Sequence, residues 1–251
     1  MTDYAGFARF YDRIVGDRSE EIDRIRAYIA AYRPAAASLL ELGCGTGALL
    51  AGLTPAYQVT GVDRSREMLA IAASRVPAAR LIRADMTSFA LAERFDVAIC
   101  MFDTLNHLPS FDRWQALFDR VHEHLAPGGL FIFDVNTSGR LRRLHGGPSF
   151  LEEVDGNVVV MSVEPAGGWL SMWQTRIFER LHDDIYRLHD ERILELGVPL
   201  AHLRAALAGR FEVLLAEDLD GGQVSDDCDR VFFAARRLPG PADLASPSGP
   251  G

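Results

Sequence analysis

Three glycines at alternate positions, Gly43, Gly45 and Gly47, carry the clearest chemical signal in this chain. An apolar run at 38–42 leads into them, and a helical pattern follows. Glycine has no Cβ, so the backbone can turn tightly here and come close to a ligand. Strand, glycine turn and helix N-terminus in this order predict a nucleotide pocket. The pattern also satisfies the looser dinucleotide fingerprint G-x-G-x-x-[G/A], with Ala48 in the last place, so it does not select one cofactor.

A carboxylate stands at the right distance to complete such a pocket. Asp63 follows Gly43 by twenty residues, the spacing at which an acidic side chain meets a ribose diol. Asp85, the region of Asp103, and Asp134 also fall where apolar strands are expected to end. Because ligands in an open parallel sheet bind outside the carboxyl ends of the strands, we expect these acidic groups to surround one site.

The elements that must position these residues alternate between helix and strand. Apolar residues repeat at helical spacing over 19–32, and Pro34 marks the end of that helix. Nearly continuous apolar segments, with helical patterns between them, predict five strands at 38–43, 57–62, 81–84, 95–101 and 130–135. This alternation is typical of an α/β fold with a parallel sheet covered on both faces.

The pattern changes after Asn136. Three strands of an antiparallel insertion are expected near 157–163, 169–180 and 185–195. Helical spacing resumes at 198–208, and two further strands at 211–217 and 230–236 should pair antiparallel, because the polar loop between them leaves no room for a helix.

These patterns predict a Rossmann-like domain formed by residues 1–139 and 196–238. Residues 140–195 would be an inserted β lid or dimerisation subdomain, and 239–251 a disordered tail rich in Pro, Gly and Ser. Side chains of the insertion that could touch an acceptor, or only face solvent, are Trp173, Arg176, Tyr186, His189 and Arg192.

Composition narrows the function further. The 251 residues carry a formal net charge of −9 and no basic run, which argues against nucleic acid as a partner. Cys44, Cys100 and Cys228 lack the spacing of a zinc site or a disulfide framework. The chain shows neither a signal peptide nor about 18 consecutive apolar residues, so we expect a cytoplasmic protein with no membrane partner.

Two features separate the possible cofactors. Acidic residues, including Glu41 and Asp85, surround the expected pocket, and no phosphate-binding cation is evident. An acidic rim suits a cationic cofactor better than a pyrophosphate. In addition, the sheet ends in an antiparallel pair of strands, whereas dinucleotide enzymes usually continue with a parallel strand.

At this point the chain resembles a class I S-adenosylmethionine-dependent methyltransferase. The resemblance covers about residues 5–135, in the family's order and spacing. Its motifs are Glu-Leu-Gly-Cys-Gly-Thr-Gly at 41–47, Gly-Val-Asp-Arg-Ser-Arg-Glu-Met-Leu at 61–69, Ala-Asp-Met at 84–86, Phe-Asp-Val-Ala at 95–98 and Leu-Ala-Pro-Gly-Gly-Leu at 125–130. It implies a Rossmann-like, seven-stranded, mostly parallel sheet with an antiparallel last strand, and S-adenosyl-L-methionine as cofactor, with S-adenosyl-L-homocysteine as product.

The resemblance also implies roles for individual residues. Gly43, Cys44 and Gly45 would line the methionine moiety, and Asp63 would accept both ribose hydroxyls. Asp85 would accept a hydrogen bond from the adenine amino group. The remaining residues implied to contact the cofactor are Tyr11 on an N-terminal cap helix, Met68, Met86, Met101 and Phe102.

Methyl transfer from a sulfonium needs mainly an aimed and desolvated nucleophile, and a base only if the acceptor arrives protonated. His107 is the candidate base, because histidine titrates in the useful range, and Tyr11 is the second candidate catalytic residue. The motif [N/D]-P-P-[Y/F/W], typical of methylation at planar amides and base nitrogens, is absent. The segment 101–108 instead resembles the small-molecule branch that N-methylates amino sugars and other amines in natural-product pathways.

One departure leaves the acceptor open between nitrogen and oxygen. The sugar enzymes carry Gly-His-Leu where this chain has Asn106 before His107. Asp103, Asp134 and Asn136 resemble the magnesium ligands of catechol-type O-methyltransferases, but Val135 separates the last two and turns one side chain to the other face. We therefore expect no metal, and a magnesium soak without effect on rate or affinity would support this.

Two other classes stay open at this stage: a nucleotide-dependent oxidoreductase, and a partner or sensor that binds the cofactor without turnover. A small-molecule acceptor and a possible homodimer complete the expectations.

Overall fold

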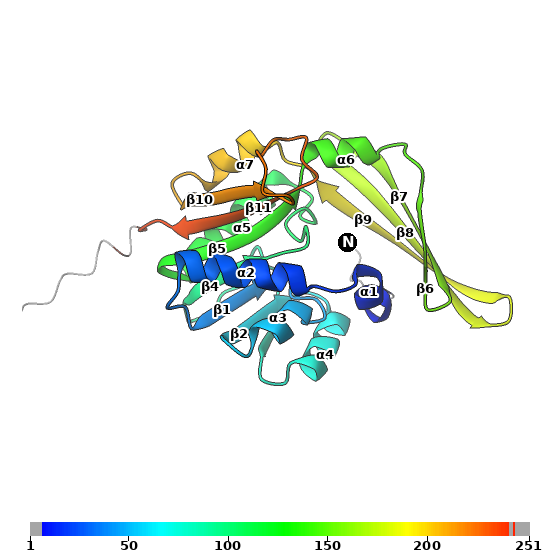
Figure 1. The fold of residues 1–251 in the computed structure, drawn as a ribbon, viewed down its shortest axis with the longest axis horizontal. Helices are drawn as coiled ribbons and strands as arrows, with labels where there is room; N and C mark the ends of the chain where they lie inside the picture. Colours follow the sequence, from blue (N-terminus) through cyan, green and yellow to red (C-terminus); the bar gives the residue numbers. More distant parts are fainter. Residues whose placement is uncertain (1–6, 241–242, 244–251) are drawn as a thin grey trace, which may run out of the picture.

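The computed structural model describes residues 7–240 and residue 243. Most of the tail expected at 239–251 therefore lies outside the described residues. Figure 1 shows two sheets, with the α1 helix lying between them.

The larger sheet has seven strands in the order β10-β11-β5-β4-β1-β2-β3. Their bounds are Ser38–Leu42 for β1, Gln58–Asp63 for β2, Arg80–Arg83 for β3, Phe95–Cys100 for β4, Leu125–Asn136 for β5, Phe211–Asp218 for β10 and Arg230–Arg237 for β11. Strands β1 to β5 pair in parallel, whereas β11 runs antiparallel to both β5 and β10. The predicted sheet with an antiparallel last strand is confirmed.

Helices cover both faces of this sheet. Helices α2 (Ser19–Tyr32) and α3 (Ala48–Leu53) pack on one face, and α5 (Phe111–His124) and α7 (Leu200–Leu207) on the other. Side chains of a strand alternate between faces, and on β1 Leu39 joins the first layer while Leu40 joins the second. Two buried layers explain why the strands read as continuous apolar runs. Among the described residues, no helix is both long and apolar enough to cross a membrane.

Local sequence signals account for most of the element ends. Helix α4 (Arg66–Arg75) begins after Ser65, whose Oγ accepts a hydrogen bond from the Met68 N–H at 3.3 Å. The expected helix at 19–32 coincides with α2, and the one at 198–208 contains α7. Strand β5 starts earlier than the expected residue 130, because Leu125 already pairs with Phe95 before the Pro-Gly-Gly segment.

The inserted region differs from the prediction in two places. It opens with a helix, α6 (Ser138–Leu144), which the Thr137 side chain caps by accepting from the Arg140 N–H at 3.0 Å. Its sheet has four strands, and not three, in the order β6-β7-β8-β9. The bounds are Phe150–Val154 for β6, Asn157–Gly167 for β7, Leu170–His182 for β8 and Ile185–Leu196 for β9. The unpredicted β6 is a short edge strand whose residues are mostly exposed, so it lacks an apolar pattern.

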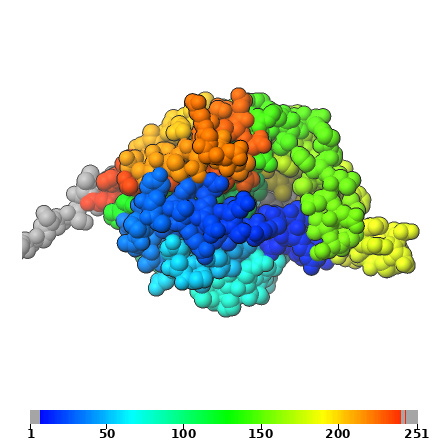
Figure 2. Space-filling view, viewed as in Figure 1, coloured from blue at the N-terminus to red at the C-terminus, as the bar shows by residue number. Residues whose placement is uncertain are grey.

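Helix α1 (Ala8–Val15) joins the two sheets. Phe7 and Phe10 pack with Val159 and Ile177 of the inserted sheet in a small buried cluster. Towards the larger sheet, the Asp12 carboxylate accepts from Thr46 Oγ1 at 2.6 Å and pairs with Arg75. Figure 2 shows this N-terminal segment, in blue, running across the front of the molecule to meet the green strand of the inserted sheet.

Candidate functional site

The glycine turn follows β1 directly. Gly43, Gly45 and Gly47 all have positive φ, at 72°, 52° and 74°. A Cβ on Gly43 would lie 2.3 Å from the Thr104 Cγ2 atom, so a side chain cannot fit there. A Cβ on Gly45 would meet nothing within 4 Å, which means that the turn opens onto free space at this residue. A ligand can therefore approach the backbone closely at Gly45.

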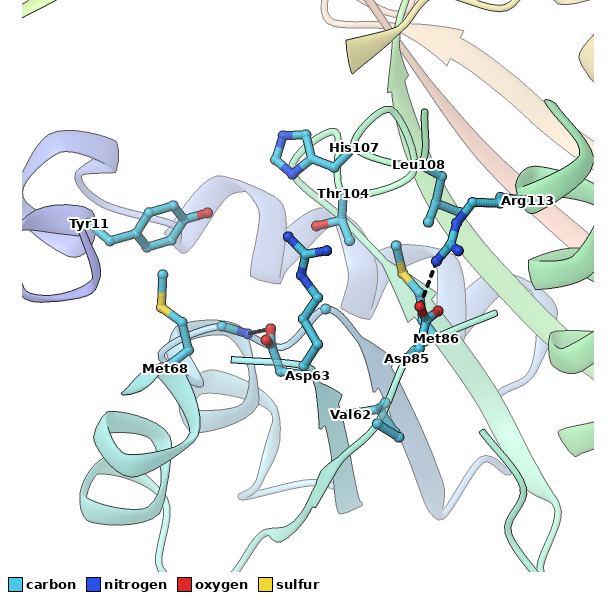
Figure 3. A pocket seen from close by; sticks show the side chains of 14 residues that line it. Tyr11, Val62, Asp63, Met68, Asp85, Met86, Thr104, His107, Leu108 and Arg113 are labelled. Atoms are coloured by element: carbon cyan, nitrogen blue, oxygen red, sulfur yellow. Dashed lines mark hydrogen bonds and ion pairs between the residues drawn. The ribbon is translucent and has the colours of Figure 1, made fainter. Parts of the chain in front are cut away.

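Asp63 closes the same opening from the end of β2. Its Oδ2 accepts from the Gly45 N–H at 2.9 Å (Figure 3). Its Oδ1 accepts from the Ser65 N–H at 2.8 Å. Burial raises the pKa of this carboxyl, while the backbone hydrogen bonds oppose the change. Each carboxylate oxygen can accept a further hydrogen bond, so Asp63 can bind two adjacent hydroxyl groups.

A cavity extends from Asp63 in two directions along the carboxyl edge of the sheet. At one end Asp85, Met86 and Arg113 line it, and at the other Tyr11; in Figure 3, His107 lies between these two ends, beside Thr104.

The Asp85 carboxylate is already engaged by protein groups. It accepts from the Thr87 N–H at 2.8 Å and pairs with Arg113 at 2.6 Å. Burial alone would raise the pKa of Asp85, but the hydrogen bonds from Thr87 and the Arg113 guanidinium lower it overall. Asp85 therefore holds Arg113 at the wall where the adenine is expected.

A second, smaller cavity adjoins the first at Tyr11 and the glycine turn, and its other walls include Arg18, Glu41 and Phe102. The Arg18 guanidinium lies 4.7 Å from the centre of the Phe102 ring, and only 7% of the residue is exposed. Glu41 is buried as well, and its Oε2 has no hydrogen-bond partner among the described residues. A buried cation and a buried carboxylate in one cavity fit the carboxylate and ammonium groups of an amino-acid moiety.

Tyr11 covers both cavities from α1. Figure 3 shows its hydroxyl directed into the space between Met68 and Thr104. Burial raises the pKa of Tyr11 to about 12, against an opposing effect of Arg18. The phenol is therefore neutral near pH 7 and can donate a hydrogen bond, but it is a poor proton acceptor.

His107 lies at the mouth of the larger cavity, between two carboxylates. Its Nε2 is 3.6 Å from an Asp103 oxygen and 3.8 Å from an oxygen of Glu195 on β9. Burial by itself lowers the pKa of His107, but Asp103 and Glu195 raise it overall. Arg230 of β11 pairs with Asp103 at 2.7 Å and with the fully buried Asp134 at 2.8 Å.

Asp103, His107 and Glu195 offer atoms close enough together to hold a metal ion. Their surroundings fit an ion-pair network better, because Arg230 already neutralises Asp103. The metal ligands considered from the sequence are also engaged: Asp134 with Arg230, and Asn136 through its Nδ2, which donates to Glu195 at 2.9 Å. We assign no metal to either set.

The structure brings together the residues that the sequence suggested as cofactor-binding or catalytic. Walls of the two cavities include Tyr11, Gly43, Cys44, Gly45, Asp63, Met68, Asp85, Met86, Met101, Phe102 and His107. Their individual roles stay predictions. Of the five insertion side chains suggested to touch an acceptor, none lines these cavities; His189, for example, pairs with Glu179 at 2.9 Å beside α1.

Sequence reasoning missed Arg18, Thr104, Arg113 and Glu195. No motif contains Arg18 or Glu195, and each reaches the site through an element outside the glycine-turn unit. Thr104 had one available signal, since it lies in the segment after β4 that also carries His107.

The known proteins that this chain resembles are methyltransferases. Residues 39–129 match the family described as "Methyltransferase domain". The chain is 36% identical over 140 residues to dTDP-3-amino-3,6-dideoxy-alpha-D-glucopyranose N,N-dimethyltransferase of Streptomyces fradiae, over 53% of this chain and 55% of that enzyme. It therefore spans about half the length of this curated relative.

Two solved structures are similar over most of the chain. A methyltransferase from Clostridium acetobutylicum, described as S-adenosylmethionine-dependent, has a TM-score of 0.84 at 24% identity and covers 95% of this chain and 100% of that one. An amino pentose methyltransferase from Micromonospora echinaspora, solved with S-adenosylmethionine bound, has a TM-score of 0.77 at 27% identity, over 92% and 96% of the two chains.

Proposed function

We propose that this chain, a class I S-adenosylmethionine-dependent methyltransferase in its sequence and fold, transfers a methyl group to a nitrogen or oxygen of a small molecule. The observation that carries the proposal is the pair of adjoining cavities. One contains Asp63, which can hold a ribose diol, and the other contains Arg18 and Glu41, which can hold an amino-acid group. S-adenosylmethionine presents both groups on one molecule, with the reactive sulfonium between them.

The cofactor supplies an electrophilic methyl group when bound. The protein residues bind and orient the two reactants and exclude water. Gly45 leaves room for the ligand at the turn, and Gly43 allows the close approach of Thr104. Tyr11 covers the ligand from α1, and Met68 and Met86 provide apolar walls along the larger cavity.

An amine is the first acceptor to test, and a hydroxyl the second. The relatives support nitrogen, because the Streptomyces fradiae enzyme is named as an N,N-dimethyltransferase of an amino sugar. His107 at the cavity mouth could take the proton that an ammonium must lose before it can attack.

Asn106 stands where the sugar enzymes have the glycine of Gly-His-Leu. Its side chain has a structural role in this chain. Its buried side chain donates to the carbonyl oxygens of Asn136 and Leu196, both at 2.9 Å, and accepts from the Asn136 N–H at 3.0 Å. Asn106 thereby fixes the His107 loop to β5 and to the end of the inserted sheet. The substitution is thus compatible with an amine acceptor.

We propose a domain organisation that fits this function. Residues 1–139 and 196–238 would bind the cofactor, and 140–195 would act as a lid over the acceptor or as a dimer contact. A small-molecule acceptor and a second copy of the chain are the partners that we propose.

Calorimetric titration with S-adenosylhomocysteine tests the cofactor assignment. Wild type should bind with micromolar affinity, and Asp63→Ala should weaken binding about 10- to 100-fold, the equivalent of losing hydrogen bonds to a charged acceptor. Asp23→Ala, an exposed change on α2, serves as the matched control and should leave binding unchanged. Absence of binding to wild type, with NAD binding instead, would favour an oxidoreductase.

An acceptor screen then tests the reaction. The panel begins with the amino sugar that names the Streptomyces fradiae relative and continues with simpler amines and phenols. Binding of S-adenosylhomocysteine with no methylation of any acceptor would favour a non-catalytic partner or sensor.

A further inference from the structure

We propose that Glu195, on strand β9 of the inserted sheet, positions His107 as the proton acceptor for a cationic amine. The inserted sheet would then supply a part of the methyl-transfer site as well as covering it. This inference rests on the proposed function and deepens it, because it assigns the acceptor to the amines that arrive protonated.

Glu195 is held where it faces His107. Only 4% of the residue is exposed, and its Oε1 lies 3.8 Å from the His107 Nε2. Its other oxygen accepts from the Asn136 Nδ2 at 2.9 Å, which fixes the carboxylate against β5. The backbone beside it is fixed too, since the Leu196 N–H donates to the Asn106 carbonyl oxygen at 2.8 Å. The carboxylate therefore keeps one orientation relative to the imidazole.

Asp103 also approaches His107 and raises its pKa together with Glu195, but Asp103 has a second cationic partner. The Arg230 guanidinium pairs with Asp103 at 2.7 Å and with Asp134 at 2.8 Å. Among the described residues, His107 is the basic group within ion-pair distance of Glu195. A buried carboxylate is costly unless a nearby group compensates its charge. A positive charge on His107 would compensate Glu195, so this carboxylate stabilises the imidazolium.

That arrangement suits an acceptor that carries a proton to be removed. A protonated amine gives one N–H proton to the imidazole, whose charge Glu195 then balances. The amine lone pair, now free, forms a bond to the methyl carbon as the carbon–sulfur bond of the cofactor breaks. The sulfur keeps that electron pair and becomes a neutral thioether, and the methylated nitrogen carries the positive charge. The proton on His107 returns to solvent after product release. An orienting carboxylate behind a histidine base is a general solution for this task.

Other charged groups around His107 must be counted in any titration. Asp103 lies on the same loop, Arg230 and Asp134 are on β11 and β5, and Arg64 and Arg140 act from the end of β2 and from α6. Burial raises the pKa of Glu195 to about 7, with Asp103 acting in the same direction and His107 opposing it. The protonation of Glu195 and that of His107 therefore depend on each other.

The first test measures the pKa of His107 directly, by NMR of its ring Cε1 proton in the protein without cofactor or acceptor. Glu195→Gln removes the charge but keeps an oxygen that can accept from Asn136. The pKa of His107 should fall in E195Q, because a negative charge that stabilises the imidazolium is lost. Asp190→Asn, an exposed carboxylate on the same strand, is the matched control and should leave this pKa unchanged. An unchanged pKa in E195Q, or equal changes in both variants, would overturn the proposal.

A second variant guards against misfolding of E195Q. Glu195→Asp keeps the negative charge on a shorter side chain, so the pKa of His107 should stay closer to that of wild type than in E195Q. If the two variants give the same lowered pKa, the charge of Glu195 is not what acts on His107.

The pH dependence of methylation provides a readout that a purely structural role would not move. With an amine acceptor, kcat/KM for E195Q should fall about tenfold or more near pH 7, and the acidic limb of the profile should move to lower pH with the pKa of His107. If the acidic limb of the E195Q profile lies at the same pH as that of wild type, the inference is wrong. Failure of wild type to bind S-adenosylhomocysteine would defeat the proposed function, whereas the NMR titration would still decide whether Glu195 acts on His107.

Discussion

The buried position of the Glu41 carboxylate lowers the stability of the ligand-free protein, but it leaves the carboxylate able to bind a ligand. It is fully buried beside the glycine turn, and its Oε2 has no hydrogen-bond partner among the described residues. Burial raises the pKa of this carboxyl well above its usual value, with Asp63 acting in the same direction and Arg18 opposing. A carboxyl with a raised pKa in the folded state contributes stability below its unfolded pKa. That contribution is lost as pH rises through the folded pKa.

We therefore expect Glu41→Gln to raise the Tm of the ligand-free protein near pH 7 to 8. Each kcal/mol gained corresponds to about 2–4 °C for a chain of this size. The difference should shrink towards pH 4, where wild-type Glu41 is protonated as well. Calorimetric scans across this range measure it, with the exposed Glu20→Gln as the control. A stabilisation that is equal at both pH values would show that ionisation of Glu41 is not its cause.

Arg18 has a defined partner in the proposed cofactor. Its buried guanidinium lines the smaller cavity, where an amino-acid carboxylate would lie. Arg18→Gln should weaken S-adenosylhomocysteine binding about 10- to 100-fold, the loss of a charged hydrogen bond. Methylthioadenosine, which lacks the amino-acid group, is the matched ligand and should bind both proteins alike. Calorimetry with the two ligands separates a lost contact from a damaged cavity, since damage would weaken both.

At the scale of elements, α1 is fixed by few contacts to the glycine turn. The Asp12 carboxylate accepts from Thr46 Oγ1 at 2.6 Å and pairs with Arg75 and, at 3.4 Å, with Arg18. Asp12→Ala should loosen α1 and lower S-adenosylhomocysteine affinity several-fold, because Tyr11 on the same helix covers both cavities. Hydrogen exchange should show faster exchange across Ala8–Val15 with a nearly unchanged Tm. Unchanged exchange in α1 would contradict this role for Asp12.

The strands and helices of the larger sheet could be predicted because local signals agree there. Two-sided burial makes strands such as Phe95–Cys100 nearly continuously apolar, and a serine cap starts α4. The sequence did not predict strand β6 or helix α6, because both elements are short. In addition, β6 is mostly exposed, and α6 lies where a β insertion was expected. Their conformation depends on the neighbouring strands and on the Thr137 cap more than on their own periodicity.

The residues of the site also include some that could be predicted from the sequence and some that could not. Asp63 and the glycines could be found because one strand–turn–helix unit fixes their spacing. Glu195 could not, since nothing local links residue 195 to His107. The two meet only because the inserted sheet leads back to β5 beside the loop that carries His107, and Asn106 joins these parts.

At the scale of the molecule, three parts converge on one place. The larger sheet provides the glycine turn and Asp63, α1 provides Tyr11, and the inserted sheet provides Glu195. Helix α1 packs on Val159 and Ile177 of the inserted sheet while Asp12 holds it to Thr46. Ordering of α1 by the cofactor would therefore also order the acceptor side of the site.

The outer face of the inserted sheet provides the basis for the proposed homodimer. His189 lies against Phe10 of α1, with ring centres 5.5 Å apart. Side chains alternate along a strand, so Tyr186 and Leu188 of β9 point to the opposite face. They are 42% and 52% exposed, and Leu188 pairs across the sheet with Phe178. We expect a second copy of the chain to cover the apolar side chains of Tyr186, Leu188 and Phe178 on this face.

Leu188→Glu should then weaken self-association at least about tenfold, or about 1.4 kcal/mol, because a charge would be buried at the contact in place of an apolar side chain. Sedimentation equilibrium over a range of protein concentrations measures the dissociation constant. The control is Asp23→Ala on α2, far from this sheet in the sequence and in the fold. S-adenosylhomocysteine affinity should be the same in the variant and in wild type, because no cavity-lining residue is altered. A wild-type protein that stays monomeric throughout the range would contradict the homodimer and leave the inserted sheet with the lid role alone.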